Sequence, residues 1–253
     1  MRMQSVLKDK RVLITGSSRG IGRALAVGFA SCGARVAVHG VHPSAALEQT
    51  REQIAALGGT SLAVCGDLAD PRAADALMDA VEKVWGGVDI LICNVSIQIR
   101  RPWLEISQEE MQVQTQVNLF STVRLMQRAV PYMRAQNWGR IITIGSVQQN
   151  KPHPDMLLYA ANKCGVYSVV RNLALQLAPE HITVNNLAVG TIYTDRNEAV
   201  LADAAYLRQV EGSIPAGFIG QPEDCVGAAL LLSDEAGRYI TGENIHVDGG
   251  KFI

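Results

Sequence analysis

The chain has 253 residues, nearly half of them apolar, which fits one large α/β domain or two small ones with a sizeable core. Its 23 Lys and Arg against 24 Asp and Glu leave a formal charge of −1, which argues against a protein that binds nucleic acid or a membrane surface. No apolar run is long enough to span a membrane, and the first residues lack the apolar core of a signal peptide. The five cysteines form no CxxC pair and no metal-ligand spacing, so we expect reduced, mostly buried thiols in a cytoplasmic protein without a metal.

Short apolar strands alternate with helical segments along the chain. Strands are expected at residues 11–15, 35–39, 62–65, 88–93, 141–144, 182–187 and 244–247. Helices are expected at residues 21–29, 45–57, 73–84, 108–133, 159–177 and 222–232, whereas residues 190–215 show no clear period. Repeated strand–helix units predict one domain, 1–253, with a doubly wound parallel sheet of about seven strands and helices on both faces.

A glycine-rich turn joins the first strand to the first helix. Its glycines let the backbone turn tightly and let a pyrophosphate approach the positive end of the helix dipole. The turn alone is a weak signal, but strand, turn and helix together are the context that a phosphate-binding loop requires. The candidate phosphate-binding residues are Gly16, Ser18, Arg19, Gly20, Ile21 and Gly22.

Three polar residues follow the apolar core of the fifth strand: Ser146, Tyr159 and Lys163. Residues four apart share a helix face, so Tyr159 and Lys163 are expected to point the same way. A neighbouring ammonium favours the phenolate over the phenol, which makes a tyrosine a better proton-transfer group at neutral pH. A serine hydroxyl at the adjacent strand end can polarise a carbonyl. Taken alone, such a pair is more often a half-buried aromatic and a solvated charge.

These motifs together resemble the short-chain dehydrogenase/reductase family, over essentially the whole chain. Thr15-Gly16-x-x-x-Gly20-Ile21-Gly22 is similar to the family's cofactor loop. The residues that match the family's catalytic tetrad in type, order and spacing are Asn118, Ser146, Tyr159 and Lys163. The branch it is most similar to contains gluconate 5-dehydrogenases and other sugar-acid dehydrogenases, and the resemblance implies a single-domain Rossmann fold.

Other positions extend the resemblance and also depart from it. Asp67 matches the family's adenine-side acid, and Gly249-Gly250 near the end is typical of the family. The family's Asn-Asn-Ala-Gly segment reads Cys93-Asn94-Val95-Ser96 here, and its Pro-Gly reads Val189-Gly190. Both departures lie on the nicotinamide side, and neither removes a proton-transfer group.

The resemblance implies a role for each tetrad residue. Tyr159 is the general acid in reduction and the base in oxidation. Lys163 assists Tyr159 and holds the nicotinamide ribose, while Ser146 donates a hydrogen bond to the substrate oxygen. Asn118 holds a water that links Lys163 to solvent. Hydride passes between the nicotinamide and the substrate carbon.

The resemblance also implies a cofactor site and an assembly. The cofactor-binding residues beyond the glycine-rich turn are Gly40, Asp67, Leu68, Asn94, Tyr159, Lys163, Gly190, Ile192 and Thr194. A homotetramer is implied, with the helices of residues 108–133 and 166–177 packing between subunits.

The end of the second strand favours NADP over NAD. NAD-specific Rossmann folds place an acid there for the ribose 2′-hydroxyl, but residues 38–42 contain no Asp or Glu and Gly40 stands in the segment. Arg19 can pair with a 2′-phosphate, and His39 or His42 can assist.

A double-arginine segment points to the substrate. Arg100 and Arg101 resemble a segment of the sugar-acid branch, and a guanidinium there can hold a carboxylate. With Gln148, Ser146 and Tyr159 they form the expected substrate site. The alternative is that both arginines are surface or subunit-contact residues with no role in substrate binding. Residues 190–215 are expected to form a lid over the substrate.

Three functions remain open. The first is an NADP-preferring dehydrogenase or reductase of a sugar acid or polyol. The second is a reductase of 3-oxoacyl thioesters, since those relatives share the Ser-Arg-Gly-Ile-Gly turn. The third is a catalytically silent nucleotide-binding regulatory protein on the same fold. The intact tetrad argues against the third.

Overall fold

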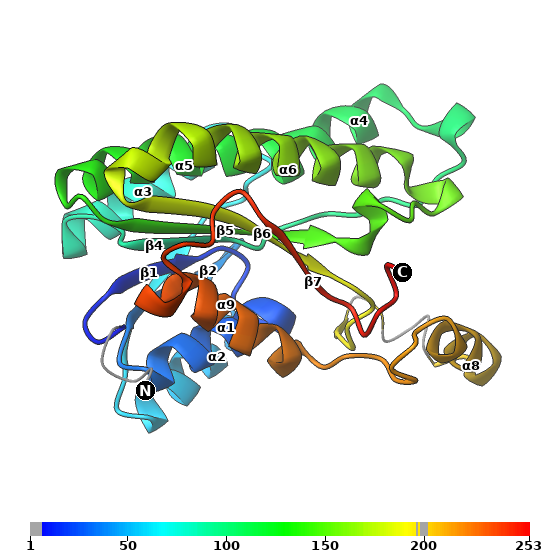
Figure 1. Cartoon of the computed structure of the whole chain (residues 1–253), viewed down its shortest axis with the longest axis horizontal. Helices are drawn as coiled ribbons and strands as arrows, with labels where there is room; N and C mark the ends of the chain where they lie inside the picture. The colour runs from blue at the N-terminus through cyan, green and yellow to red at the C-terminus, as the bar shows by residue number, and fades with distance from the viewer. Residues whose placement is uncertain (1–6, 196, 198–201) are drawn as a thin grey trace.

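One parallel sheet runs through the middle of the molecule (Figure 1). The structure is a computed structural model that describes residues 7–195, 197 and 202–253. The strands are β1 (Arg11–Ile14), β2 (Arg35–Gly40), β3 (Thr60–Cys65), β4 (Ile90–Cys93), β5 (Gly139–Ser146), β6 (Ile182–Val189) and β7 (Asn244–Val247). Their order is β3-β2-β1-β4-β5-β6-β7. The chain therefore reverses its direction of travel between β1 and β4, and ligands of such sheets bind outside that switch point.

Helices cover both faces of the sheet (Figure 1). The helices on one face are α1 (Gly20–Ser31), α2 (Ala45–Ala56) and α9 (Val226–Ser233). Those on the other are α3 (Ala73–Trp85), α5 (Ser121–Ala135) and α6 (Leu157–Leu177), with α4 (Gln108–Thr115) leading into α5. A further helix, α8 (Ala204–Gly212), lies apart from both layers, beyond the end of the sheet.

Short turns of helix connect these elements. The 3₁₀ turns are η2 (Trp103–Glu105), η4 (Val147–Gln149), η5 (Pro154–Met156), η6 (Ala178–Glu180), η7 (Pro222–Cys225) and η8 (Glu235–Gly237). A π-helical turn, η3 (Gln116–Phe120), joins α4 to α5. Local chemistry sets several ends: the Ser44 and Ser107 side chains cap α2 and α4, and Gly86 ends α3 in the left-handed conformation that glycine adopts without strain.

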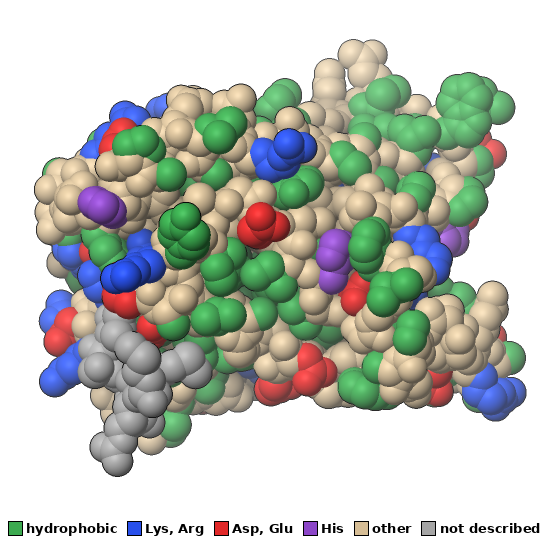
Figure 2. Space-filling view, viewed as in Figure 1, with side chains coloured by type: hydrophobic (Ala, Val, Ile, Leu, Met, Phe, Trp, Pro, Cys, Tyr) green, Lys and Arg blue, Asp and Glu red, His purple; other side chains and the backbone are tan. Residues whose placement is uncertain are grey.

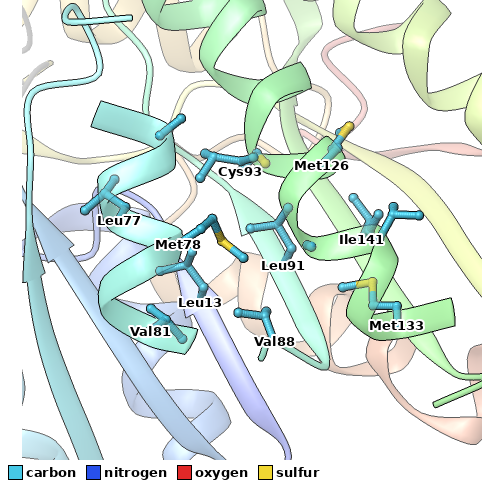
Figure 3. Close-up of a cluster of buried hydrophobic side chains, with 14 of the residues drawn as sticks. Leu13, Leu77, Met78, Val81, Val88, Leu91, Cys93, Met126, Met133 and Ile141 are labelled. Carbon is cyan, nitrogen blue, oxygen red and sulfur yellow. The ribbon is translucent and has the colours of Figure 1, made fainter. Parts of the chain in front are cut away.

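The core has two layers because the strands are apolar on both faces. Leu13 of β1 lies in one layer, while Val12 and Ile14 lie in the other, as the strand's alternation requires. The residues in the layer of Leu13 include Leu77, Met78, Val81, Met126 and Met133 (Figure 3). Each such side chain stabilises the fold by about 1.5–3 kcal/mol when fully buried. This core fixes the strand ends that carry the site.

The predicted single-domain Rossmann fold and its seven parallel strands are confirmed. Two helical details were missed. The helix expected over 108–133 contains the π-helical turn Gln116–Phe120, and the segment without a clear period contains α8, which the Asp203 side chain caps. Short helices of this kind carry too few turns for a periodic signal.

The cysteines correct another expectation. Cys93 and Cys225 are buried, Cys32 is half-buried, and Cys65 and Cys164 are exposed, so the thiols are not mostly buried although all five are free. On the face shown in Figure 2, acidic and basic side chains are interspersed outside the grey residues. Within the described part of the chain, no helix has the length and apolarity needed to cross a bilayer.

Candidate active site

A cavity of about 680 Å³ opens at the carboxyl ends of the strands, beside the switch point. Eighteen of the predicted residues line it: Gly16, Ser18, Arg19, Gly20, Ile21, Gly22, Gly40, Asp67, Leu68, Asn94, Arg100, Ser146, Gln148, Tyr159, Lys163, Gly190, Ile192 and Thr194. Asn118 and Arg101 do not line it. The cavity therefore joins the predicted cofactor residues to most of the predicted substrate residues.

The glycine-rich turn forms a cradle that fits a dinucleotide pyrophosphate. Gly16 has φ +66°, and a Cβ atom on Gly22 would lie 2.2 Å from the Gly16 carbonyl oxygen, so only glycine allows this approach of α1 to the turn. No side chain caps the start of α1, and its first turn holds no acid. Backbone N–H groups and the helix dipole there suit a phosphate.

Asn94 ties the end of β4 to this turn. Its backbone N–H donates to the Thr15 hydroxyl at 2.9 Å, and its Nδ2 donates to the carbonyls of Thr15 at 2.9 Å and Gly16 at 3.0 Å. Three bonds from one residue hold the two strands together at the switch point. Asn94 thereby fixes the shape of the cradle as well as lining the cavity.

His39 braces the cradle from beneath. Gly16 N–H donates to its Nδ1 at 2.9 Å, so Nε2 carries the proton and donates to the Gly66 carbonyl at 2.9 Å. Burial lowers the pKa of His39, although the Gly66 carbonyl and the Asp67 carboxylate act in the opposite direction. Both ring nitrogens are thus engaged by backbone, which does not leave His39 free to assist a 2′-phosphate as the sequence suggested. His42 is exposed just after β2.

Ser146, Tyr159 and Lys163 form the floor of the cavity. Ser146 is the last residue of β5, and its hydroxyl accepts the Gln148 N–H at 3.2 Å. Lys163 Nζ donates to the Ile144 carbonyl at 2.6 Å and lies 5.6 Å from the centroid of the Tyr159 ring. All three side chains are buried yet line the cavity. The arrangement offers two hydroxyls and an ammonium to a carbonyl oxygen, which suits proton transfer to it.

Asn118 lies behind this floor, in the π-helical turn. Its Oδ1 accepts the Ile97 N–H and its Nδ2 donates to the Ile97 carbonyl, both at 2.9 Å. Such π-turns often occur at functional sites. Both polar atoms of the side chain are thus bonded to the segment after β4, and Ser96, Ile97 and Gln98 of that segment line the cavity.

The two predicted arginines separate. Arg100 lines the cavity, whereas Arg101 Nε donates to Glu110 Oε1 at 2.9 Å outside it. Glu110 also completes the capping box of α4 with Ser107, so the pair anchors the loop to that helix. The structure therefore does not bring Arg101 to the substrate, and the surface alternative describes it better.

Residues absent from the predicted site also line the cavity. They are Lys151, His153 and Lys251, among others. We call Arg100, Lys151, His153 and Lys251 the substrate end. Lys251 directly follows Gly249-Gly250, a pair that the family resemblance had already marked, and this adjacency was the signal available in the sequence.

The segment after β6 roofs the cavity. Ile192 forms a β-bridge with Gly220, and a Cβ atom on Gly20 would lie 3.3 Å from the Thr194 side chain. Tyr206 and Val210 of α8 also line the cavity. Residues 196 and 198–201 of the expected lid lie outside the described residues. The described part holds no group of three or more His, Cys, Asp or Glu side chains able to hold a metal.

Comparison with known proteins agrees with this geometry. A family model described as enoyl-(acyl carrier protein) reductase matches residues 16–251. A 3beta-hydroxysteroid dehydrogenase 1 of Eggerthella lenta is 36% identical over 252 residues, 99% of this chain and 97% of that protein.

Two solved structures are similar in fold as well as sequence. An NADP-bound 3-oxoacyl (acyl-carrier-protein) reductase from Agrobacterium tumefaciens C58 has TM-score 0.95 and 38% identity, covering 99% of this chain and 98% of that chain. A putative NAD(P)-dependent gluconate 5-dehydrogenase from Beutenbergia cavernae, with bound NADP at low occupancy, has TM-score 0.92 and 34% identity over 97% and 98%. The chain is a member of the short-chain dehydrogenase/reductase family, an NAD(P)-dependent oxidoreductase that acts on CH–OH groups.

Proposed function

We propose that the chain is an NADP-preferring enzyme that interconverts a secondary alcohol and a carbonyl of a sugar acid or polyol. The observation that carries the proposal is the joint placement of Ser146, Tyr159 and Lys163 at the floor of the cavity that begins in the glycine-rich cradle. The third alternative, a catalytically silent nucleotide-binding protein, would not require this complete set of proton-transfer groups.

The proposed mechanism assigns one step to each residue. In reduction, the Tyr159 hydroxyl gives its proton to the substrate oxygen, and the Ser146 hydroxyl donates a hydrogen bond to the same oxygen as charge develops. Lys163, held against the Ile144 carbonyl, favours the phenolate that Tyr159 leaves. The cofactor supplies or accepts the hydride when bound. Oxidation reverses the proton step.

The coenzyme preference follows from the end of β2. Gly40 offers no carboxylate to a 2′-hydroxyl, and no acid repels a 2′-phosphate there. Arg19 lines the cavity, and its guanidinium lies 3.5 Å from Asp195 in an exposed pair. A dianionic phosphate can replace that single carboxylate.

Arg100 supports an acidic or polyhydroxy substrate, and the similarity to the gluconate 5-dehydrogenase supports a sugar acid. The similarity to the 3-oxoacyl reductase supports the second candidate, reduction of an oxoacyl thioester. The test follows NADPH absorbance with keto-sugar acids, polyols and oxoacyl thioesters. Turnover of thioesters alone would replace the sugar-acid assignment, and no turnover despite tight NADPH binding would revive the silent protein.

Assembly and compartment are part of the proposal. We propose a homotetramer, supported by exposed apolar side chains on and beside the long helices: Phe120, Leu157 and Leu175. Five free cysteines support a reducing, cytoplasmic location. A stable monomer in light scattering at working concentration would contradict the tetramer.

A further inference from the structure

We propose that Lys251, assisted by Lys151, binds an anionic group of the substrate at the substrate end of the cavity. The inference rests on the proposed function and names the chemistry of its substrate. It adds to Arg100 of the double-arginine segment two lysines that come from separate parts of the chain.

Both ammonium groups are held at the turn that carries Lys251. Lys251 Nζ donates to the Thr191 hydroxyl at 2.8 Å, and Lys151 Nζ donates to the Lys251 backbone carbonyl at 3.3 Å. Both residues line the cavity, as does Thr191. Lys151 lies five positions after Ser146, and all three residues line the same cavity.

The backbone that carries Lys251 is fixed rather than loose. The Asp248 carboxylate accepts the N–H groups of Gly250 at 2.9 Å and Phe252 at 2.8 Å. The rings of His246 and Phe252 stack, with centroids 4.1 Å apart. The Gly249 carbonyl accepts the Ala216 N–H at 2.9 Å, which joins this turn to the segment after α8. Lys251 is therefore positioned before any ligand arrives, which lowers the cost of binding.

The charge at this end is positive. Among the described residues that line the cavity, the carboxylates belong to Asp67 and Asp195, and Asp195 pairs with Arg19 at the cofactor end. The cations of the substrate end are Arg100, Lys151 and Lys251.

The pKa of Lys251 responds to this concentration of positive charge. Burial and the nearby Lys151 ammonium lower the pKa of Lys251, with Asp248 opposing them. Both Asp248 oxygens are already occupied by backbone N–H groups, so that carboxylate is not directed at the ammonium. An anion placed between the two ammonium groups would relieve their repulsion and offset the desolvation of Lys251.

The ligand chemistry is an oxyanion, which a carboxylate or a phosphate can supply. Lysine ammonium groups act as point charges and accept either geometry, unlike the planar fork of arginine. Three matched probes separate the sources: gluconate, glucitol and glucitol 6-phosphate. They share a carbon chain and differ in carrying a carboxylate, no charge or a phosphate.

The first measurement is kcat/KM for the three probes in wild type, Lys251→Gln, Lys151→Gln and the control Lys83→Gln, an exposed lysine of α3. We expect wild type to prefer one anionic probe over glucitol by about tenfold to hundredfold. Lys251→Gln should lose most of that preference, Lys151→Gln part of it, and Lys83→Gln none. An unchanged preference in Lys251→Gln would overturn the assignment.

A second measurement tests anion binding at Lys251 even if the enzyme turns over none of the probes. With NADPH saturating, so that the cofactor phosphates are already in place, each probe is titrated while the Tm is followed. An anion should raise the Tm of wild type and Lys251→Arg, which keeps the charge, but not of Lys251→Gln. Equal Tm shifts in wild type and Lys251→Gln, or no shift in wild type, would overturn the anion site. Absence of turnover with an intact Tm response would instead contradict the proposed reaction alone.

Discussion

The floor of the cavity and its substrate end are built in different ways. At and around the floor, polar side chains are bonded to the backbone of the sheet or of the segments it carries. Buried Lys163 donates to the Ile144 carbonyl, and buried Asn118, behind the floor, is bonded to Ile97. Half-buried Asn94 ties the cradle to the end of β4 through the carbonyls of Thr15 and Gly16. At the substrate end, Arg100, Lys151 and Lys251 stand on connecting segments, and the first two are exposed. The proposed proton-transfer groups are thus held by the core, while the proposed substrate-binding groups stand on loops whose residues can change without disturbing that core.

The largest effect should come from the floor. Tyr159→Phe keeps the buried ring and removes the hydroxyl, so packing is preserved while the proton donor is lost. We expect a fall in kcat of about 10²–10⁴-fold with NADPH affinity kept, measured by turnover and by nicotinamide fluorescence on binding. Near-normal turnover would remove Tyr159 from the mechanism.

A substitution of Asn118 tests whether the polar side chains behind the floor also stabilise the fold. Asn118→Leu keeps the number of side-chain heavy atoms but leaves the half-buried N–H and carbonyl of Ile97 without their partners. A group left unpaired away from water costs about 1–3 kcal/mol, so the free energy of unfolding in urea should fall by an amount in that range. The matched control Gln112→Leu, exposed on α4, should change it by less than about 0.5 kcal/mol. Equal stability of the two variants would show that Asn118 is not a structural tie.

The contrast between the floor of the cavity and its substrate end also explains which features the sequence could predict and which it could not. Strands have strong local signals, and the flanking strand and helix identify the glycine turn, so the sheet and the residues of the cradle were predictable from the sequence pattern. The separation of Arg100 from Arg101 depends on Glu110, and the contact of Lys151 with Lys251 depends on a turn one hundred positions away. Such placements arise from tertiary packing of loops, for which no periodic signal exists. The bracing role of His39 was hidden for the same reason.

Gly40→Asp tests the preference for NADP over NAD at the cofactor end of the cavity. Gly40 has no positive φ, and an added Cβ atom would lie 3.4 Å from the His42 carbonyl oxygen and 3.6 Å from Leu47, which is ordinary contact. The backbone at this position therefore does not require glycine. The new carboxylate should accept the 2′-hydroxyl of NAD and repel the 2′-phosphate of NADP. We expect the NADP-to-NAD ratio of kcat/KM to fall about tenfold to hundredfold.

Arg19→Ala should act in the same direction with a smaller effect. The Arg19 side chain is 69% exposed, so solvent screens its attraction for a phosphate. We expect the same ratio of kcat/KM to fall about twofold to fivefold, with the value for NAD nearly unchanged. Arg35→Ala, on an exposed arginine of β2, serves as the control. A wild-type preference for NAD, or an unchanged ratio in Arg19→Ala, would refute the coenzyme assignment.

His39 tests the cradle through the pH dependence of stability. Its pKa is lowered in the folded chain, so as pH falls below about 6.5 the unfolded chain takes up a proton before the folded chain does. The stability that neutral His39 contributes is therefore fully present above the ordinary histidine pKa. It is lost as pH falls from there toward the folded pKa, with a limiting slope of about 1.4 kcal/mol per pH unit.

Urea unfolding between pH 8 and pH 5 should show this loss in wild type. In His39→Asn, whose side-chain oxygen can still accept the Gly16 N–H, the slope should flatten. The control variant His42→Asn, at an exposed histidine that does not contact the cradle, should keep the wild-type slope. A slope unchanged in His39→Asn would mean that other groups cause the acid sensitivity and that the cradle does not depend on a neutral His39.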